Sequence, residues 1–145
     1  MANVITKTPW WFWVVSGLAF VWNLLGVGAF FADMSMSYDD MVTNYGTALA
    51  DAAANQPGFI TVAYGVAVLG GAIGCLLLLL RRKLALWPLL LSLICVLIQQ
   101  GYSWFGTDVM STVSAGNKAM YISIVIIAVF LVWFARAMTA RTILR

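Results

Sequence analysis

Amide and phenol side chains interrupt stretches of the sequence that are otherwise apolar. These side chains are Asn23, Tyr64, Gln99, Gln100 and Tyr102. Each is uncharged and can both donate and accept hydrogen bonds, so the set suits a neutral hydroxylated solute or a lipid headgroup. Because an unpartnered amide is unfavourable in hydrocarbon, each must face protein or water. These five residues are therefore the candidates for a polar site at membrane depth.

Two interpretations of these residues stay open at this point. In the first, which the sequence favours, the amides bond to each other or to backbone carbonyls and hold helices together, each bond contributing roughly 0.6–2 kcal/mol. In the second, they line a cavity that opens toward the outer side, where Asp33 continues the helical face that carries Asn23. A dry interface would support the first interpretation, and a polar cavity touching Asn23 and Gln99 would support the second.

Several kinds of chemistry are excluded by residue type. The sequence has no histidine and no glutamate, and no aspartate falls in the middle of an apolar stretch. Haem ligation by two histidines, histidine-based zinc sites and histidine-base catalysis are therefore excluded. The lack of glutamate also argues against a small multidrug efflux pump, because those proteins have a similar size but depend on a membrane-embedded glutamate. Cys75 and Cys95 stand alone in apolar runs and are interpreted as small buried hydrophobes. We expect no enzyme, no cofactor and no metal site.

The elements that position these residues are expected to be membrane-spanning helices. Hydrophobic residues make up 63% of the chain and charged residues 9%, and the mean hydropathy is +0.97. Four apolar stretches match the length of about 20 residues that spans a bilayer, at residues 10–32, 59–80, 84–105 and 119–138. They do not alternate with a period of two, which argues against a barrel. The sequence predicts an all-α, antiparallel four-helix transmembrane bundle in one domain, residues 1–145.

The outer loop, residues 33–58, is expected to carry a short amphipathic helix. Ser37 precedes two acids as an N-cap does. Met41, Tyr45 and Leu49 then recur at helical spacing. We predict one helix over residues 38–54 that lies on the membrane surface or across the mouth of the bundle, although Gly46 interrupts the pattern.

The distribution of charge predicts the topology. All five acids and one cation, Lys118, fall on the side of the outer loop. The other seven cations fall on the opposite side, at Lys7, Arg81, Arg82, Lys83, Arg136, Arg141 and Arg145. The positive-inside rule places both termini in the cytoplasm. Because the cations flank apolar helices, they indicate membrane topology, and no nucleic-acid partner is expected.

Glycines in the second stretch predict close helix packing. Gly70 and Gly74 form a GxxxG pair, and Gly71 lies beside them. Small residues at this spacing let two backbones approach each other. The pair can join two helices of one chain, which we favour, or two protomers.

The order of several short motifs resembles a family of small four-helix bacterial inner-membrane proteins of unknown function, some of which carry an automatic "sugar transporter" label. The motifs lie in all four stretches and are residues 22–26 (WNLLG), 70–83 (GGAIGCLLLLLRRK), 91–93 (LSL), 99–102 (QQGY) and 132–136 (VWFAR). The resemblance covers nearly the whole chain and implies the fold and a location in the bacterial inner membrane. It implies no catalytic residues.

From the sequence we expect a non-enzymatic membrane protein that acts through helix packing, as a homo-oligomer or as an accessory subunit of a larger membrane complex, with membrane lipids around it. The alternative is a transporter or channel for a small neutral, sugar-like solute or a lipid headgroup.

Overall fold

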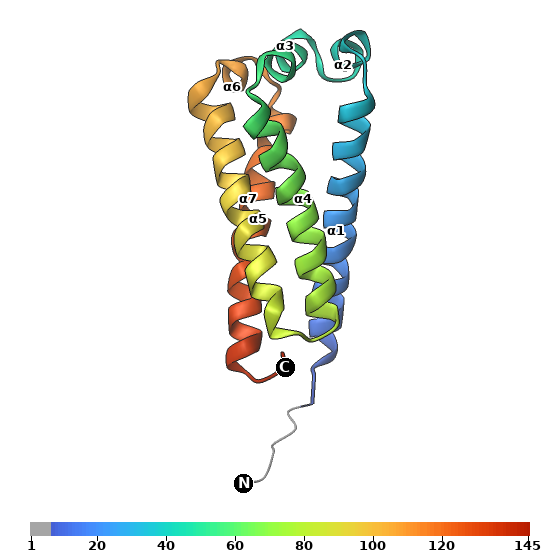
Figure 1. Ribbon diagram of the computed structural model, residues 1–145, viewed down its shortest axis with the longest axis vertical. Coiled ribbons are helices and arrows are strands. Elements are labelled where there is room, and N and C mark those ends of the chain that lie inside the picture. The colour runs from blue at the N-terminus through green and yellow to red at the C-terminus, as the bar shows by residue number, and fades with distance from the viewer. Residues whose placement is uncertain (1–6) are drawn as a thin grey trace.

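The computed structural model describes residues 7–145 and shows a bundle of four long antiparallel helices (Figure 1). They are α1 (Trp10–Ser35), α4 (Gly58–Leu79), α5 (Leu86–Gly101) and α7 (Ala115–Ala140). With its flanking turns α5 extends over residues 83–106, and all four segments are long and apolar enough to cross a membrane. The predicted all-α four-helix transmembrane bundle is confirmed, and the chain is a multi-pass membrane protein.

Shorter elements connect the long helices. Near one end of the bundle lie α2 (Tyr38–Tyr45), α3 (Thr47–Asn55) and α6 (Val109–Thr112) (Figure 1). A 3-10 turn, η1 (Lys83–Ala85), precedes α5, and a π-helical turn, η2 (Tyr102–Gly106), follows it. The third predicted span, residues 84–105, is therefore an α-helix with a different helical turn at each end.

The outer loop contains two helices, which corrects the prediction of a single helix over residues 38–54. Ser37 caps α2 as predicted, because its hydroxyl accepts a hydrogen bond from the Asp40 N–H at 3.2 Å. Gly46 then ends α2 with φ of +88°. That conformation is unfavourable for residues with a β-carbon, so the chain turns at the glycine and α3 begins in a new direction.

The four long helices pack in the order α1, α4, α5, α7. At one end of the bundle a dry core joins all four of them, with Phe12 of α1, Leu78 of α4, Leu89 of α5 and Phe134 of α7 as members. The rings of Phe12 and Phe134 stack with their centres 5.8 Å apart, so that α1 and α7 close the ring of helices at this end.

Glycines of α4 lie against neighbouring helices of the same chain. A β-carbon at Gly70 would lie 3.1 Å from the carbonyl oxygen of Pro88, and one at Gly74 would lie 2.5 Å from Cγ of Leu89. Both contacts are with α5. Gly71 lies instead against Asn23 of α1. The small residues therefore allow α4 to approach two partners within one chain.

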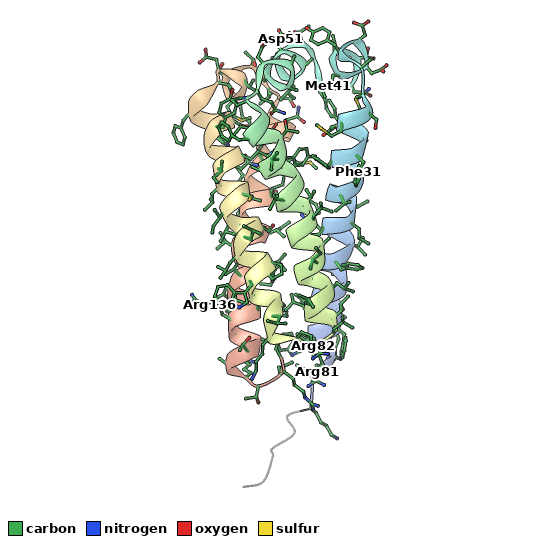
Figure 2. The ribbon with its side chains drawn as sticks, in the orientation of Figure 1. Phe31, Met41, Asp51, Arg81, Arg82 and Arg136 are labelled. Atoms are coloured by element: carbon green, nitrogen blue, oxygen red, sulfur yellow. The ribbon has the colours of Figure 1, made fainter. Side chains whose placement is uncertain are left out.

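The charges separate along the bundle axis (Figure 2). Asp51 lies near the end that carries α2 and α3, and Arg81 and Arg82 lie near the other end. We call these the acidic end and the basic end. At the basic end the last residues of the chain pair with the turn before α5: the Arg145 N–H donates to the Arg81 carbonyl at 2.6 Å, and the Lys83 N–H donates to the Arg145 carbonyl at 2.9 Å. Leu144, only 1% exposed, is held in the core by this pairing.

Candidate functional site

A cavity of about 430 Å³ lies in the half of the bundle toward the acidic end. Its walls come from α1, α4, α5 and α7, and residues of α2 and α3, including Met41 and Leu49, also line it. The loop helices therefore lie across the mouth of the bundle, which is one of the two placements predicted from the apolar stripe of the loop.

The cavity lies toward the acidic end, where α1 no longer contributes residues to the apolar core. At the basic end α1 contributes Phe12 and Ala19 to the core. Toward the acidic end a second apolar cluster packs Ala63 and Ala67 of α4 against Val96 of α5, with partly buried residues of α4 and α7 around it, and α1 contributes none of its members. Instead α1 supplies one wall of the cavity, through Trp22, Asn23, Leu25, Gly26, Ala29, Asp33 and Met34.

All five polar residues singled out in the sequence line this cavity: Asn23, Tyr64, Gln99, Gln100 and Tyr102. They come from α1, α4, α5 and η2, and helical geometry alone could not show that these faces meet. Their environments differ, and the difference separates residues that hold helices together from residues that are available to a ligand.

Asn23 is satisfied by the protein. Its amide nitrogen donates to the Ala19 carbonyl at 2.9 Å and to the Cys75 sulfur at 3.4 Å. Its Oδ1 lies where a β-carbon of Gly71 would otherwise be. Asn23 therefore joins α1 to α4 at the floor of the cavity. Ser92 has a similar role between α5 and α4, because its hydroxyl donates to the Ala67 carbonyl at 2.6 Å.

Gln100 is different, because it is buried and incompletely bonded. It is 5% exposed, and its Oε1 has no hydrogen-bond partner in the part of the chain that the structure describes. A buried acceptor without a partner is uncommon and is usually completed by water or a ligand. Gln100 lines the cavity, while Oε1 itself is covered, so a bound molecule can donate to this oxygen when the side chain turns toward the cavity.

The most polar point of the cavity lies at Asp33, near the end of α1. The Tyr45 hydroxyl donates to Asp33 Oδ1 at 3.1 Å, and the Tyr64 hydroxyl donates to Asp33 Oδ2 at 3.2 Å. One carboxylate thus joins α1, α2 and α4. Burial raises the pKa of Tyr45, and the charge of Asp33 and its hydrogen bond raise it further. Tyr45 therefore remains a neutral donor at pH 7.

Sequence reasoning identified part of this arrangement. It placed Asp33 on the face of Asn23, but it assigned Tyr45 only to the apolar stripe of the loop. Trp22 and Tyr121, which also line the cavity, were not recognised as site residues. Only their positions in the sequence could have indicated them: Trp22 is next to Asn23, and Tyr121 lies near the start of α7.

No cluster of three or more histidine, cysteine, aspartate or glutamate side chains able to hold a metal ion occurs within residues 7–145. Comparison of the chain with family models, with curated proteins and with solved structures finds no match.

Proposed function

We propose that this protein is a non-enzymatic membrane protein that binds a small amphiphilic molecule in the cavity between α1, α4, α5 and α7, as transporters do. The observation that supports the proposal is the cavity itself, since it brings Gln99 and Gln100 together with four tyrosines, Tyr45, Tyr64, Tyr102 and Tyr121. A volume of about 430 Å³ falls within the usual range of sites for small molecules.

The character of the walls supports an amphiphile. The lining surface is mostly apolar, and the polar side chains lie mainly toward the acidic end. Sites of this kind bury the apolar part of a ligand and use a small number of polar groups to orient it. The lining residues offer amides, phenols and one carboxylate, and these groups suit recognition better than bond cleavage.

The two ends of the bundle are unequal, and this supports a carrier over an open channel. The packed core around Phe12, Leu78 and Phe134 fills the basic half, while the cavity occupies the acidic half. In this conformation the cavity is therefore closed toward the basic end. Passage to the basic end would require these aromatic and aliphatic side chains to separate.

The packing role predicted from the sequence applies to one of the polar residues, because Asn23 is bonded within the protein. Association as a homo-oligomer or with a larger complex stays a prediction. The GxxxG pair gives it no support, since Gly70 and Gly74 lie against α5 of the same chain.

The proposed location is the bacterial inner membrane with both termini in the cytoplasm. The charge separation between the two ends supports this orientation through the positive-inside rule. The cavity would then lie in the periplasmic half of the membrane, below the loop that carries α2 and α3.

Blocking the cavity tests the proposal. Ala128 of α7 lines the cavity, and Ala128→Trp would place a large ring in it. Val129, the next residue, is 50% exposed, so Val129→Trp adds the same ring to the outer surface and serves as the matched control. Both variants and the wild-type protein would be placed in nanodiscs and titrated with octyl glucoside, 1-octanol, octylamine and octanoate.

We expect at least one of these probes to raise the unfolding temperature of the wild-type protein and of Val129→Trp in a saturable way. The Ala128→Trp variant should fold and show no such rise. Equal responses of the two variants, or no saturable response of the wild-type protein to any probe, would refute the proposal.

A further inference from the structure

The cavity carries a single charge. Among the described residues that line it, Asp33 is the only one with an ionised side chain, and no lysine or arginine is among them. Lys118, the one cation predicted for this side of the membrane, is adjacent in sequence to the lining residue Asn117 but does not line the cavity itself. The site therefore has an uncompensated negative charge in surroundings that are mostly apolar.

Two of the lining hydroxyls are already bonded to this charge, and acceptor atoms remain beside them. The hydroxyls of Tyr45 and Tyr64 are already directed at the carboxylate of Asp33. The remaining lone pairs of that carboxylate and the unpartnered Oε1 of Gln100 are acceptors. A protonated amine brings donors for these acceptors and also the positive charge that a neutral sugar lacks.

Aromatic rings surround the acidic end of the cavity. The rings of Tyr45, Tyr64 and Tyr121 contribute to its walls. The ring of Phe30 meets the ring of Tyr64 edge-on, with the ring centres 5.0 Å apart, and so fixes the orientation of Tyr64. Phe30 also packs against Gly65, where an added β-carbon would lie 3.0 Å from the Phe30 ring. Aromatic faces attract organic cations, with the attraction increasing when the cation is removed from water.

The cavity also reaches the perimeter of the bundle between α1 and α7. Leu25 of α1 and Met120 of α7 both line it, and they are 66% and 56% exposed. In a membrane these exposed surfaces face lipid, so an alkyl chain bound in the cavity has a route into the bilayer between the two helices.

We infer that the molecule bound here is an amphiphile with a positively charged amine as its head, placed beside Asp33 and Gln100, and with an apolar body that extends past Leu25 and Met120. This inference rests on the proposed function and specifies the class of its ligand. The carboxylate supplies the charge, the Gln100 oxygen accepts an N–H, and the tyrosine rings enclose the head.

Three probes with the same eight-carbon chain separate the charge of the head from the rest of the molecule. Octylamine is protonated at pH 7, as a lysine side chain is, 1-octanol is neutral, and octanoate is negative. Dissociation constants would be measured by titration of the wild-type protein in phosphatidylcholine nanodiscs, whose lipid has no net charge, with protein-free nanodiscs as the blank. A charge-assisted contact in a cavity of this kind should make octylamine bind about tenfold to a hundredfold more tightly than 1-octanol, with octanoate the weakest.

The variant Asp33→Asn removes the charge and keeps the shape. It should reduce the preference for octylamine over 1-octanol to less than about threefold while 1-octanol binds as before. Asp39 is exposed and is not a lining residue, so Asp39→Asn removes the same charge from the same end and should keep the preference. The comparison of the three probes on the wild-type protein does not depend on whether Asp33→Asn folds.

The charged head can belong to a membrane aminophospholipid or to a free amine. Adding phosphatidylethanolamine to the nanodiscs should weaken octylamine binding if the lipid is the source, and should leave it unchanged if a free amine is. Either result is compatible with a site for a protonated amine. Equal affinity for octylamine and 1-octanol would overturn the inference and leave the proposed function intact, whereas failure of all three probes, together with octyl glucoside, would overturn the proposed function.

Discussion

Asn23 of α1 lies directly against Gly71 of α4, so that a β-carbon added at Gly71 would overlap the Oδ1 atom of Asn23. The amide reaches across to Cys75 one turn further along α4. Toward the basic end from this contact the four helices share one apolar core. Toward the acidic end α1 still packs against α4 through Phe30, and it also forms one wall of the cavity. The pair therefore determines both the closeness of two helices and the position of the cavity floor.

Gly71→Ala should reduce the free energy of unfolding by about 1–3 kcal/mol, because the methyl group has to displace a bonded amide. Asn23→Ala should reduce it by about 1–2 kcal/mol through the lost hydrogen bonds. In the double variant the two losses should be less than additive, since the smaller side chain makes room for the methyl group. Unfolding of the purified protein in SDS measures all three values, and strict additivity would show that the two residues do not interact.

Gly74→Ala should also destabilise the folded monomer, by about 1–3 kcal/mol, because Leu89 is buried and cannot move aside. A β-carbon at Gly28 of α1 would meet no atom within 4 Å, so Gly28→Ala is the control and should be neutral or slightly stabilising. The same SDS unfolding, combined with light scattering in detergent, reports stability and oligomer size. A smaller oligomer with unchanged monomer stability would instead show that the GxxxG pair joins protomers.

Gln100→Leu should leave the free energy of unfolding unchanged or raise it by up to about 1 kcal/mol, because it removes a buried acceptor that has no partner in the described residues. Asn23→Leu, which removes bonds made within the protein, should lower it by about 1–2 kcal/mol. Octylamine should bind Gln100→Leu more weakly than the wild-type protein. A loss of stability in Gln100→Leu as large as that in Asn23→Leu would mean that both amides only hold helices together.

Tyr38 should ionise at a higher pH than an ordinary tyrosine. Its hydroxyl donates to the Asp51 carboxylate, and this bond, followed by burial and the charges of Asp51 and Asp39, raises the pKa of Tyr38. The folded state therefore favours the protonated phenol. The stabilisation is complete below the ordinary pKa of about 10 and is lost as the pH rises through the raised value.

The absorbance of tyrosinate, compared between the wild-type protein and Tyr38→Phe, isolates the titration of this one group. Asp51→Asn should lower the pKa of Tyr38 toward its ordinary value, and Asp108→Asn should not. An unchanged pKa in Asp51→Asn would show that the contact between α2 and α3 does not form in solution.

Cysteine labelling tests the orientation. After replacement of Cys75 and Cys95, a cysteine at Thr43 should react with an impermeant maleimide from the periplasmic side alone. A cysteine at Thr142 should react after the cytoplasmic side has been opened. Thr43 lies in α2 at the acidic end, and Thr142 follows α7 at the basic end. Labelling of Thr43 from the cytoplasm would reverse the proposed topology and the side on which the cavity lies.

The sequence by itself determined the class of fold, because a span of about 20 apolar residues is a local property that a bilayer accepts only as a helix. The four spans, the Ser37 cap and the separation of Asp51 from Arg81 all follow from neighbours in the chain. Gly46 shows the limit of local reasoning. The periodicity of residues 38–54 predicted one helix, but the positive φ of Gly46 divides this segment into the two helices α2 and α3.

Only the tertiary structure decided which polar residues are bonded and which are available. Asn23 and Gln100 are both amides in apolar helices, and nothing in their local sequence distinguishes them. The Asn23 amide nitrogen is bonded to Ala19 of its own helix and to Cys75 of α4, whereas the Gln100 Oε1 has no partner among the described residues. The meeting of Asp33 with Tyr45 and Tyr64, which are 12 and 31 residues away along the chain, depends in the same way on contacts between helices. The GxxxG pair signals that α4 packs closely against another helix, but no short pattern in the sequence states which polar residues of separate helices meet.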